Sequence, residues 1–428
     1  MTSPLKVAIA GLGTVGGGTV RLLQQQAGLI ATRVGRPVDL AAVSALEPPP
    51  GLDLSGVRWY GDAVAMAREA EVDVVVELIG GAHGIALTVA KTALNAGRHV
   101  VTANKAMLAY HGAELVELAE GRGLTLGFEA SVAGGIPVIK ALREGLAGNR
   151  ILEIHGILNG TCNYILTRMS REGLDFATVL AEAQALGYAE ADPSFDIDGI
   201  DAAHKVAILA SVAFGCRVRF VPGTVEGIRH LSALDIKYAE LLGYRLKLLG
   251  IARRSGAVLE QRVHPCLVPA GAPIAGVDGV FNAVTIVGDF VDRVMLVGRG
   301  AGAAPTASAV VADILDIAAG RIAPAFGVPV AALDAIEPAP LSARVGAYYL
   351  RLMVRDEVGV LASVAKALSD TGVSIAKFFQ DERSPGEKVP VVLTTHDTDE
   401  ASMQRALAII AAQDAVLEPP RLIRIEQF

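Results

Sequence analysis

Apolar runs separated by polar turns divide the first part of the chain into short strands and helices that alternate. Runs almost free of charge predict parallel strands buried on both faces, and they cover 6–10, 39–44, 73–78, 99–102 and 124–128. Helices are predicted between them, for example over 19–26 and 85–96. This alternation is typical of a doubly wound α/β sheet, so we predict a Rossmann domain over residues 1–138.

The pattern changes over residues 139–320, where strands and helices are mixed without strict alternation. Strands are predicted at 151–158, 259–267, 283–287 and 293–298, and helices at 162–169, 199–214 and 306–319. This mixture predicts a second domain of α+β type. The stretch 321–343 is rich in proline and alanine, which indicates a linker, and we place the linker at 321–346.

The last part of the chain, residues 347–428, follows a βαββαβ order. Strands are predicted at 347–354, 372–380, 389–395 and 422–425, with helices that end near 370 and cover 399–413. This order predicts a ferredoxin-like domain.

Composition narrows the class of protein. The 428 residues carry a net charge of −7 with a pI near 5.7, which argues against a nucleic-acid partner. Three widely spaced cysteines, Cys162, Cys216 and Cys266, fit neither a disulfide framework nor a zinc motif. No apolar run has transmembrane length and no signal peptide precedes the first strand, so we expect a cytoplasmic protein with no membrane partner.

A glycine motif follows the first strand directly. Gly11, Gly13 and Gly16 form GxGxxG, with Thr14 and Val15 inside it, and a predicted helix comes next. A strand, this motif and a helix in that order predict a dinucleotide site, where the backbone approaches a pyrophosphate. The alternative is an ordinary glycine turn. The end of the second strand, 44–47, has no arginine and only a late Glu47, so both NAD and NADP stay open.

The most informative chemistry lies in the stretch from Gly187 to Lys205, which is rich in acidic residues. Asp201 and Lys205 are four residues apart on a predicted helix and therefore lie on one face. They could form a solvated ion pair. The apolar run 206–210 instead places Lys205 at the edge of a buried helix, which makes it a candidate for a lowered pKa and for acid–base catalysis. Scattered histidines, among them His204 and His264, are expected to be structural.

Together the motifs make the chain similar to homoserine dehydrogenases of the monofunctional type that carry a C-terminal ACT domain. The resemblance covers nearly the whole length and rests on five motifs: Gly11-x-Gly13-x-x-Gly16, Ala103-Asn104-Lys105, the loop 129–137, Asn159-Gly160-Thr161-x-Asn163-Tyr164, and the stretch 187–205. It implies reversible hydride transfer between L-homoserine and L-aspartate 4-semialdehyde with NAD(P), on the path to threonine, isoleucine and methionine. The α+β domain would then bind substrate and support dimerisation.

The resemblance also implies roles for individual residues. Glu190 would hold the substrate ammonium, Asp201 would bind near the reacting oxygen, and Gly187 would border the substrate. Lys205 would be the main proton donor, with Lys105 as a second lysine that also faces the cofactor. A nearby ammonium can stabilise and protonate the alkoxide that forms when hydride reaches an aldehyde.

Two glycine-bearing loops would complete the site. Gly302 would approach the nicotinamide, although its segment could simply begin a helix. The family's monovalent cation, expected as Na⁺, maps onto Glu129, Val132, Gly134 and Ile136. A plain loop would explain these four residues equally well.

The C-terminal domain suggests regulation. In the ACT resemblance, Asp356, Gly359, Val360 and Leu361 form the turn where paired domains bind small amino acids, and threonine would be the natural effector. The alternative is an assembly module without a ligand. We expect a homodimer or homotetramer.

The sequence leaves two other functions open. Another amino-acid dehydrogenase would share the glycine motif but need not combine Glu190, Asp201 and Lys205. A sensor without catalysis is disfavoured by the two lysines, Lys105 and Lys205.

Overall fold

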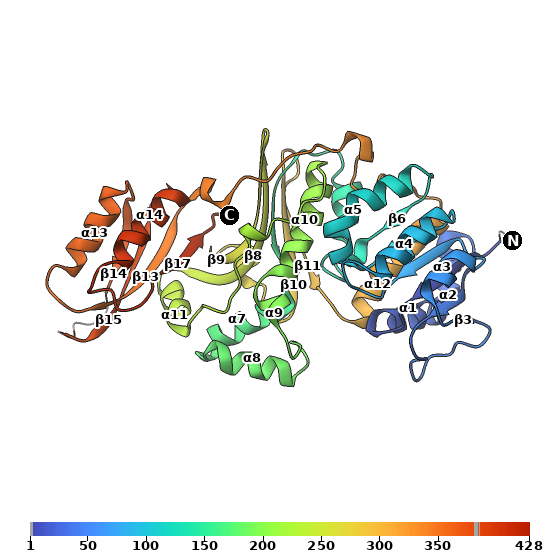
Figure 1. Ribbon diagram of the computed structural model, residues 1–428, viewed down its shortest axis with the longest axis horizontal. Helices are drawn as coiled ribbons and strands as arrows, with labels where there is room; N and C mark the ends of the chain where they lie inside the picture. Colours follow the sequence, from blue (N-terminus) through green and yellow to red (C-terminus); the bar gives the residue numbers. More distant parts are fainter. Residues whose placement is uncertain (1–2, 381–383, 385) are drawn as a thin grey trace.

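The computed structural model describes residues 3–380, 384 and 386–428. It is elongated, with the N-terminal domain at one end, a central domain, and the C-terminal domain at the other end (Figure 1). The C-terminus lies near the middle of the molecule because the last strand returns to the central domain. Among the described residues, no helix is long and apolar enough to cross a membrane.

The N-terminal domain contains a six-stranded parallel sheet with the order β3-β2-β1-β4-β5-β6. Its strands are β1 (Leu5–Ala10), β2 (Val38–Ser44), β3 (Arg58–Tyr60), β4 (Val74–Glu77), β5 (His99–Thr102) and β6 (Leu126–Gly127). This is the strand order of dinucleotide-binding folds, so the predicted Rossmann sheet is confirmed.

Helices cover both faces of this sheet. One face carries α1 (Thr14–Gln25), α2 (Ala27–Val34) and α12 (Ala303–Ala318); the other carries α3 (Ala63–Glu69), α4 (Ile85–Asn95) and α5 (Lys105–Glu120). Helix α12 follows the central domain in sequence yet packs against α1, where a Cβ on Gly18 would lie 2.8 Å from the Ala303 carbonyl oxygen. The chain therefore crosses back, and the start of α12 lies beside the dinucleotide turn.

The second sheet has nine strands in the order β11-β10-β7-β8-β9-β17-β13-β15-β14. The central domain supplies β7 (Ile151–Ile157), β8 (Tyr244–Ser255), β9 (Val258–Pro269), β10 (Phe281–Gly288) and β11 (Asp292–Arg299). Its helices are α6 (Val138–Lys140), α7 (Gly160–Glu172), α8 (Phe176–Ala185), α9 (Ser194–Ile197), α10 (Ile200–Phe214) and α11 (Ala233–Leu241). Strand β8 was not predicted, and it pairs with β9 along its whole length.

The C-terminal domain has the predicted ferredoxin-like order. It contains β12 (Val345–Gly346), β13 (Tyr348–Arg355), α13 (Val360–Asp370), β14 (Ile375–Phe379), β15 (Lys388–Thr395), β16 (Thr398–Asp399), α14 (Glu400–Ala411) and β17 (Arg421–Ile425). Residues of β13, β15 and the two α-helices form its own apolar core.

The C-terminal domain is joined to the central domain through its sheet. Strand β17 lies parallel to β9, with Arg424 opposite Cys266 and Ile425 opposite Leu267. The segment 321–346, predicted as a linker, contains no α-helix, only short 3-10 turns and the two-residue strand β12. It nevertheless packs on both preceding domains: Phe326 is fully buried against Phe128 of the N-terminal domain, and the Ala339 N–H donates to the Leu259 carbonyl oxygen of β9 at 2.7 Å. The two domains therefore form one continuous structure.

Candidate active site

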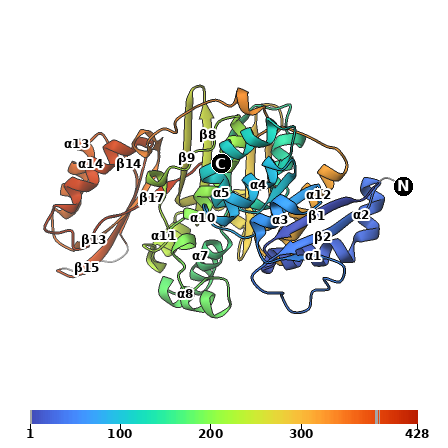
Figure 2. The same ribbon diagram turned by 45° about the vertical axis from the view of Figure 1, so that its right-hand side comes forward.

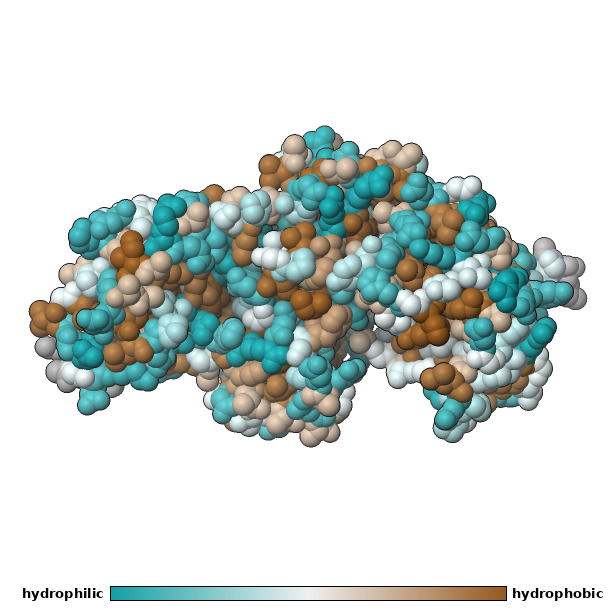
Figure 3. Space-filling model, viewed as in Figure 1, coloured by the Kyte–Doolittle hydropathy of each residue, from teal (hydrophilic) through white to brown (hydrophobic). Residues whose placement is uncertain are grey.

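A cleft of about 560 Å³ opens between the N-terminal and central domains. Figure 3 shows a notch at the surface between the lobe that carries α7 and α8 and the N-terminal domain. The predicted site residues that line the cleft are Val15, Lys105, Gly134, Gly187, Glu190, Asp201, Lys205 and Gly302. Residues that are distant in sequence and were assigned to cofactor, substrate and proton transfer thus face one cavity.

Helix α10 brings the two lysines together. It packs between helix α5 and the central sheet (Figures 1 and 2). Lys105 is the first residue of α5, at the carboxyl end of β5, and the side chain of Asn104 caps that helix through the Met107 N–H. Gly199, with φ +83°, turns the chain into α10 directly before Ile200. Both helix starts therefore point at the cleft.

Asp201 lies between Lys105 and Lys205. Its Oδ1 is 2.9 Å from the Lys105 ammonium, and its Oδ2 is 2.8 Å from the Lys205 ammonium. The Asp201 side chain is 4% exposed and that of Lys205 is 9% exposed. These values exclude the solvated ion pair that the sequence left open.

The environment affects the pKa of the three groups differently. Burial lowers the pKa of Lys205, although the charge of Asp201 opposes this. The charge of Asp201 raises the pKa of Lys105, which is partly exposed to the cleft. Burial alone would raise the pKa of Asp201, but the two lysines outweigh it and lower that pKa, so the carboxylate stays charged. Lys205 is therefore the lysine that releases a proton more readily.

Asn159 and Asp196 belong to the site but were given no role from the sequence. The Asn159 amide donates to Asp196 Oδ1 and to Asp201 Oδ2, both at 2.8 Å, while its oxygen caps α7 through the Cys162 N–H. Thr161 also donates to Asp196, at 3.2 Å. Asp196 is 37 residues from Asn159, so only the fold reveals the pairing. Burial, and then Asp201, raise the pKa of Asp196.

Glu190 and Gly187 come from the loop between α8 and α9. Gly187 has φ +73°, and the side chain of Gln184 holds the loop by donating to the Glu190 carbonyl oxygen at 3.0 Å. The Glu190 side chain is exposed at the edge of the cleft. Its negative charge is placed where a positively charged part of a substrate could enter.

The glycine motif forms a tight turn that leaves no room for a side chain at Gly11 or Gly16. A Cβ on Gly11, which has φ +95°, would lie 2.6 Å from the Leu78 carbonyl oxygen, and one on Gly16 would lie 2.0 Å from the Gly11 carbonyl oxygen. Gly13 has open space beside it, and no side chain caps the start of α1 at Thr14. The free N–H groups of that helix fit a pyrophosphate. Gly302, φ +114°, similarly precedes the uncapped start of α12 across the cleft.

The loop predicted to hold a cation is tightly folded. Ala133 and Gly134 both have positive φ, 55° and 51°. The carboxylate of Glu129 is buried and accepts the N–H groups of Ile139 and Lys140 at 2.9 and 2.8 Å. Because this carboxylate is already bound, a cation here would rely on main-chain oxygens, for example those of Val132 and Gly134. Such a donor set fits a weakly held monovalent ion better than Mg²⁺ or Ca²⁺, which favour carboxylates.

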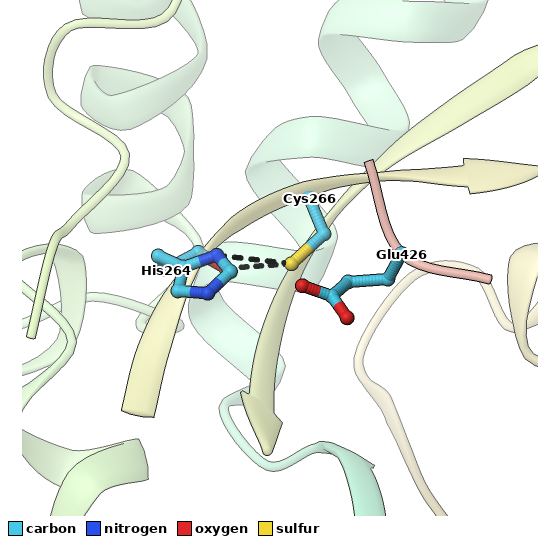
Figure 4. A group of neighbouring side chains, drawn as sticks. All are labelled: His264, Cys266 and Glu426. Atoms are coloured by element: carbon cyan, nitrogen blue, oxygen red, sulfur yellow. Dashed lines mark hydrogen bonds between the residues drawn. The ribbon is translucent and has the colours of Figure 1, made fainter. Parts of the chain in front are cut away.

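A separate buried cluster lies where the central and C-terminal domains meet. His264, Cys266 and Glu426 place one potential ligand atom each within 4.8 Å of one another, the one such group among the described residues (Figure 4). Arg262 donates to His264 Nε2 at 3.1 Å, and Arg262 and Arg344 both bind Glu426. These contacts occupy the ligand atoms, and the guanidinium charges oppose a cation. The cluster is therefore structural, as expected for His264.

A Rossmann sheet, its GxGxxG turn and a buried lysine–aspartate pair facing one cleft define an NAD(P)-dependent oxidoreductase. The sequence models described as "Homoserine dehydrogenase, NAD binding domain", "Homoserine dehydrogenase" and "ACT domain" match residues 11–129, 137–315 and 348–414. The chain belongs to the homoserine dehydrogenase family, whose members interconvert a CH–OH group and a carbonyl with NAD(P).

Individual relatives match the chain over most or all of its length. The chain is 48% identical to the homoserine dehydrogenase of Pseudomonas aeruginosa over 99% of both chains. The crystal structure of a homoserine dehydrogenase from Thiobacillus denitrificans superposes with a TM-score of 0.92 at 44% identity, covering 99% of this chain and 98% of that one. A hyperthermophilic archaeal homoserine dehydrogenase in complex with NADPH gives a TM-score of 0.61 at 27% identity, over 73% of this chain and 97% of that one.

Proposed function

We propose that Lys205 is the proton donor to the substrate oxygen when L-aspartate 4-semialdehyde is reduced to L-homoserine, and the proton acceptor in the reverse direction. The observation that carries this proposal is the buried Asp201 carboxylate between the two lysines. Lys205 donates to the Leu158 carbonyl oxygen at 2.6 Å and to Asp201 at 2.8 Å, so two fixed acceptors orient its ammonium. Burial lowers its pKa, which favours proton release to an alkoxide.

Lys105 and Glu190 would hold the substrate for this step. Lys105 keeps its proton because Asp201 raises its pKa, so it would act as a fixed positive charge beside the developing alkoxide and the cofactor. Glu190 would bind the substrate ammonium, while Gly187 leaves room beside it. Asp201 would orient the reacting oxygen through both lysines.

Gly11, Gly13, Thr14, Val15 and Gly16 would hold the cofactor pyrophosphate at the start of α1, and Gly302 would face its nicotinamide. When bound, the nicotinamide supplies or accepts the hydride. The archaeal neighbour was solved with NADPH, which supports NADP. The end of β2 at Ser44 has neither an arginine nor an adjacent acid, so NAD is the second candidate.

Further features extend the proposal. A Na⁺ ion would be held by main-chain oxygens of Glu129, Val132, Gly134 and Ile136. Threonine would bind the C-terminal domain at the turn of Asp356, Gly359, Val360 and Leu361, and lower activity from there.

We infer domains over 1–138, 139–320 and 347–428 in a cytoplasmic homodimer or homotetramer that serves threonine, isoleucine and methionine synthesis. Three buried free cysteines agree with a reducing compartment.

A direct assay tests the proposed reaction. Purified protein should oxidise NADPH or NADH in the presence of L-aspartate 4-semialdehyde and reduce NADP or NAD with L-homoserine. Comparing the two cofactors and adding NaCl or choline chloride separates the cofactor and cation proposals from the reaction itself. Absence of turnover with every cofactor would refute the proposed function.

A further inference from the structure

Helix α9 carries Asp196 into the cleft but is too short to be stable alone. It spans only Ser194–Ile197, and an isolated helix of that length does not form in water. Asp196 lines the cleft, and the Phe195 ring lies 5.6 Å from the Lys105 ammonium. The position of both side chains must therefore be set by what packs against α9.

The turn 225–229 packs so closely against α9 that a side chain at Gly227 would not fit between them. A Cβ on Gly227 would lie 2.1 Å from the Ile197 carbonyl oxygen, and Ile228 N–H donates to that same oxygen at 2.8 Å. Arg229 then binds both ends of the helix. Its guanidinium donates to Ser194 Oγ at 2.7 Å and, through two nitrogens, to the Asp198 carboxylate, once at 3.0 Å.

The other side of the same turn is bound to the C-terminal domain. The Glu226 carboxylate accepts two hydrogen bonds from Arg424 of β17, at 2.8 and 2.9 Å. The Glu226 N–H donates to the Val263 carbonyl oxygen of β9 at 2.8 Å. Arg424 is 3% exposed and is also held by Glu400 of α14, at 2.7 and 2.9 Å. Its guanidinium is therefore fixed by the C-terminal domain itself.

The geometry points to a positioning role for the turn 225–229: we propose that it transmits the docking of the C-terminal domain to α9, and so sets Asp196 in the cleft and Phe195 beside Lys105. Glu226 and Arg229 are then positioning residues, because neither touches the cleft. Arg229 is partly exposed, and exposed ion pairs contribute little to stability, so its substitution should change the orientation of α9 more than the free energy of unfolding. The inference rests on the proposed function, because it assigns the substrate to the cleft beside α9.

The test compares steady-state kinetics of Glu226→Gln, Arg229→Gln and the double variant. Glu226→Gln keeps the shape and leaves the Arg424–Glu400 pair intact. Each single variant should raise KM for homoserine roughly 3- to 10-fold, the size expected when about one ordinary hydrogen bond is lost, with little change in KM for NAD(P) or in Tm. The double variant should be no worse than the more damaging single one, because both changes interrupt one connection.

Glu418→Gln is the matched control. Its side chain is 44% exposed, close to the 46% of Glu226, and it likewise forms an ion pair. Its partner, Lys388, lies on the C-terminal domain. The control should leave KM for homoserine unchanged. Arg229→Lys, which keeps the charge, should recover part of the loss and replaces Arg229→Gln if that variant does not fold.

Three results would overturn the inference: an unchanged KM for homoserine, an equal rise in KM for NAD(P) together with a lower Tm, or additive effects in the double variant. The unmutated protein is assayed first. If it fails to turn over homoserine, that result refutes the proposed function and not the inference about the turn 225–229.

Discussion

Lys105 and Lys205 bind opposite oxygens of a single carboxylate, at 2.9 and 2.8 Å. The shared partner is Asp201, yet the pKa values of the two lysines move apart: burial lowers that of Lys205, and Asp201 raises that of Lys105. Titratable groups whose pKa values are separated by their surroundings commonly divide acid–base work between them. Here the division assigns proton transfer to Lys205 and a permanent positive charge to Lys105.

Lys205→Ala should reduce kcat by about 10²- to 10⁴-fold, as expected for the loss of a general acid. Cofactor affinity should persist, because the dinucleotide turn lies on another domain. Fluorescence titration with NAD(P)H and a turnover assay measure both quantities. Lys205→Met, which keeps more of the packing, should be equally inactive; a folded variant with near-normal kcat would remove Lys205 from the mechanism.

Glu190→Gln should raise KM for homoserine more than KM for NAD(P). A carboxylate that faces an ammonium makes a charge-assisted bond, which an amide cannot replace. Glu182→Gln serves as control, since Glu182 lies on α8 and pairs with Arg168 at the surface. Equal damage to both KM values would indicate a structural role for Glu190.

Asp313 and Glu129 should make stability fall as the pH rises. Burial raises the pKa of Asp313 from 3.8 to about 6 and that of Glu129 from 4.5 to about 7, with Asp313 adding to the second shift. A carboxyl group with a raised pKa binds its proton more tightly in the folded state. Its stabilisation is complete below the unfolded pKa and is lost as the pH rises through the folded one.

Between pH 4 and pH 7, the free energy of unfolding should therefore fall less in the Asp313→Asn variant than in the unmutated protein. The expected difference is on the order of 1–3 kcal/mol. Urea unfolding at several pH values measures the difference. Asp370→Asn, at an exposed pair with Lys366, is the control and should keep the wild-type slope. Parallel curves for the Asp313 variant and the unmutated protein would show that Asp313 does not titrate in this range.

Arg351→Met should destabilise the whole protein. Arg351 of β13 binds Asp235 at 2.7 and 3.2 Å, and Asp235, fully buried, also forms the capping box of α11 with Ser232. Removing one partner of a buried pair leaves an uncompensated charge, so unfolding should become easier by about 3 kcal/mol. Arg355→Met, at an exposed pair with Glu357, should cost much less in the same urea titration. Equal stability of the two variants would contradict a stabilising contact between the domains at Arg351.

Threonine should raise Tm by mass action if it binds the C-terminal domain, and lower activity without competing with NAD(P). Deleting this domain is a poor test, because β17 pairs with β9 and Arg351 supports Asp235. Calorimetry on the full chain and on Asp356→Ala is better, with weaker binding expected for the variant. No heat and no shift in Tm with millimolar threonine would leave the domain as an assembly module.

The sequence by itself determined the two kinds of sheet, the dinucleotide turn, and eight of the twenty-four residues that line the cleft. Buried parallel strands appear as unbroken apolar runs, and GxGxxG between a strand and a helix allows few conformations, so local pattern was enough. The spacing of Asp201 and Lys205 likewise places them on one face of a helix, because residues four apart are neighbours on any α-helix.

Tertiary structure alone decided the features that depend on distant partners. Strand β8 was missed because charges interrupt its apolar run; its Lys247 is buried only because the Val277 carbonyl oxygen and Asp278 accept its hydrogen bonds. The bridging role of Asn159, the return of α12 to the first sheet, and the connection from Arg424 to α9 have no local pattern. Each depends on contacts between residues far apart in the chain, which local propensity does not specify.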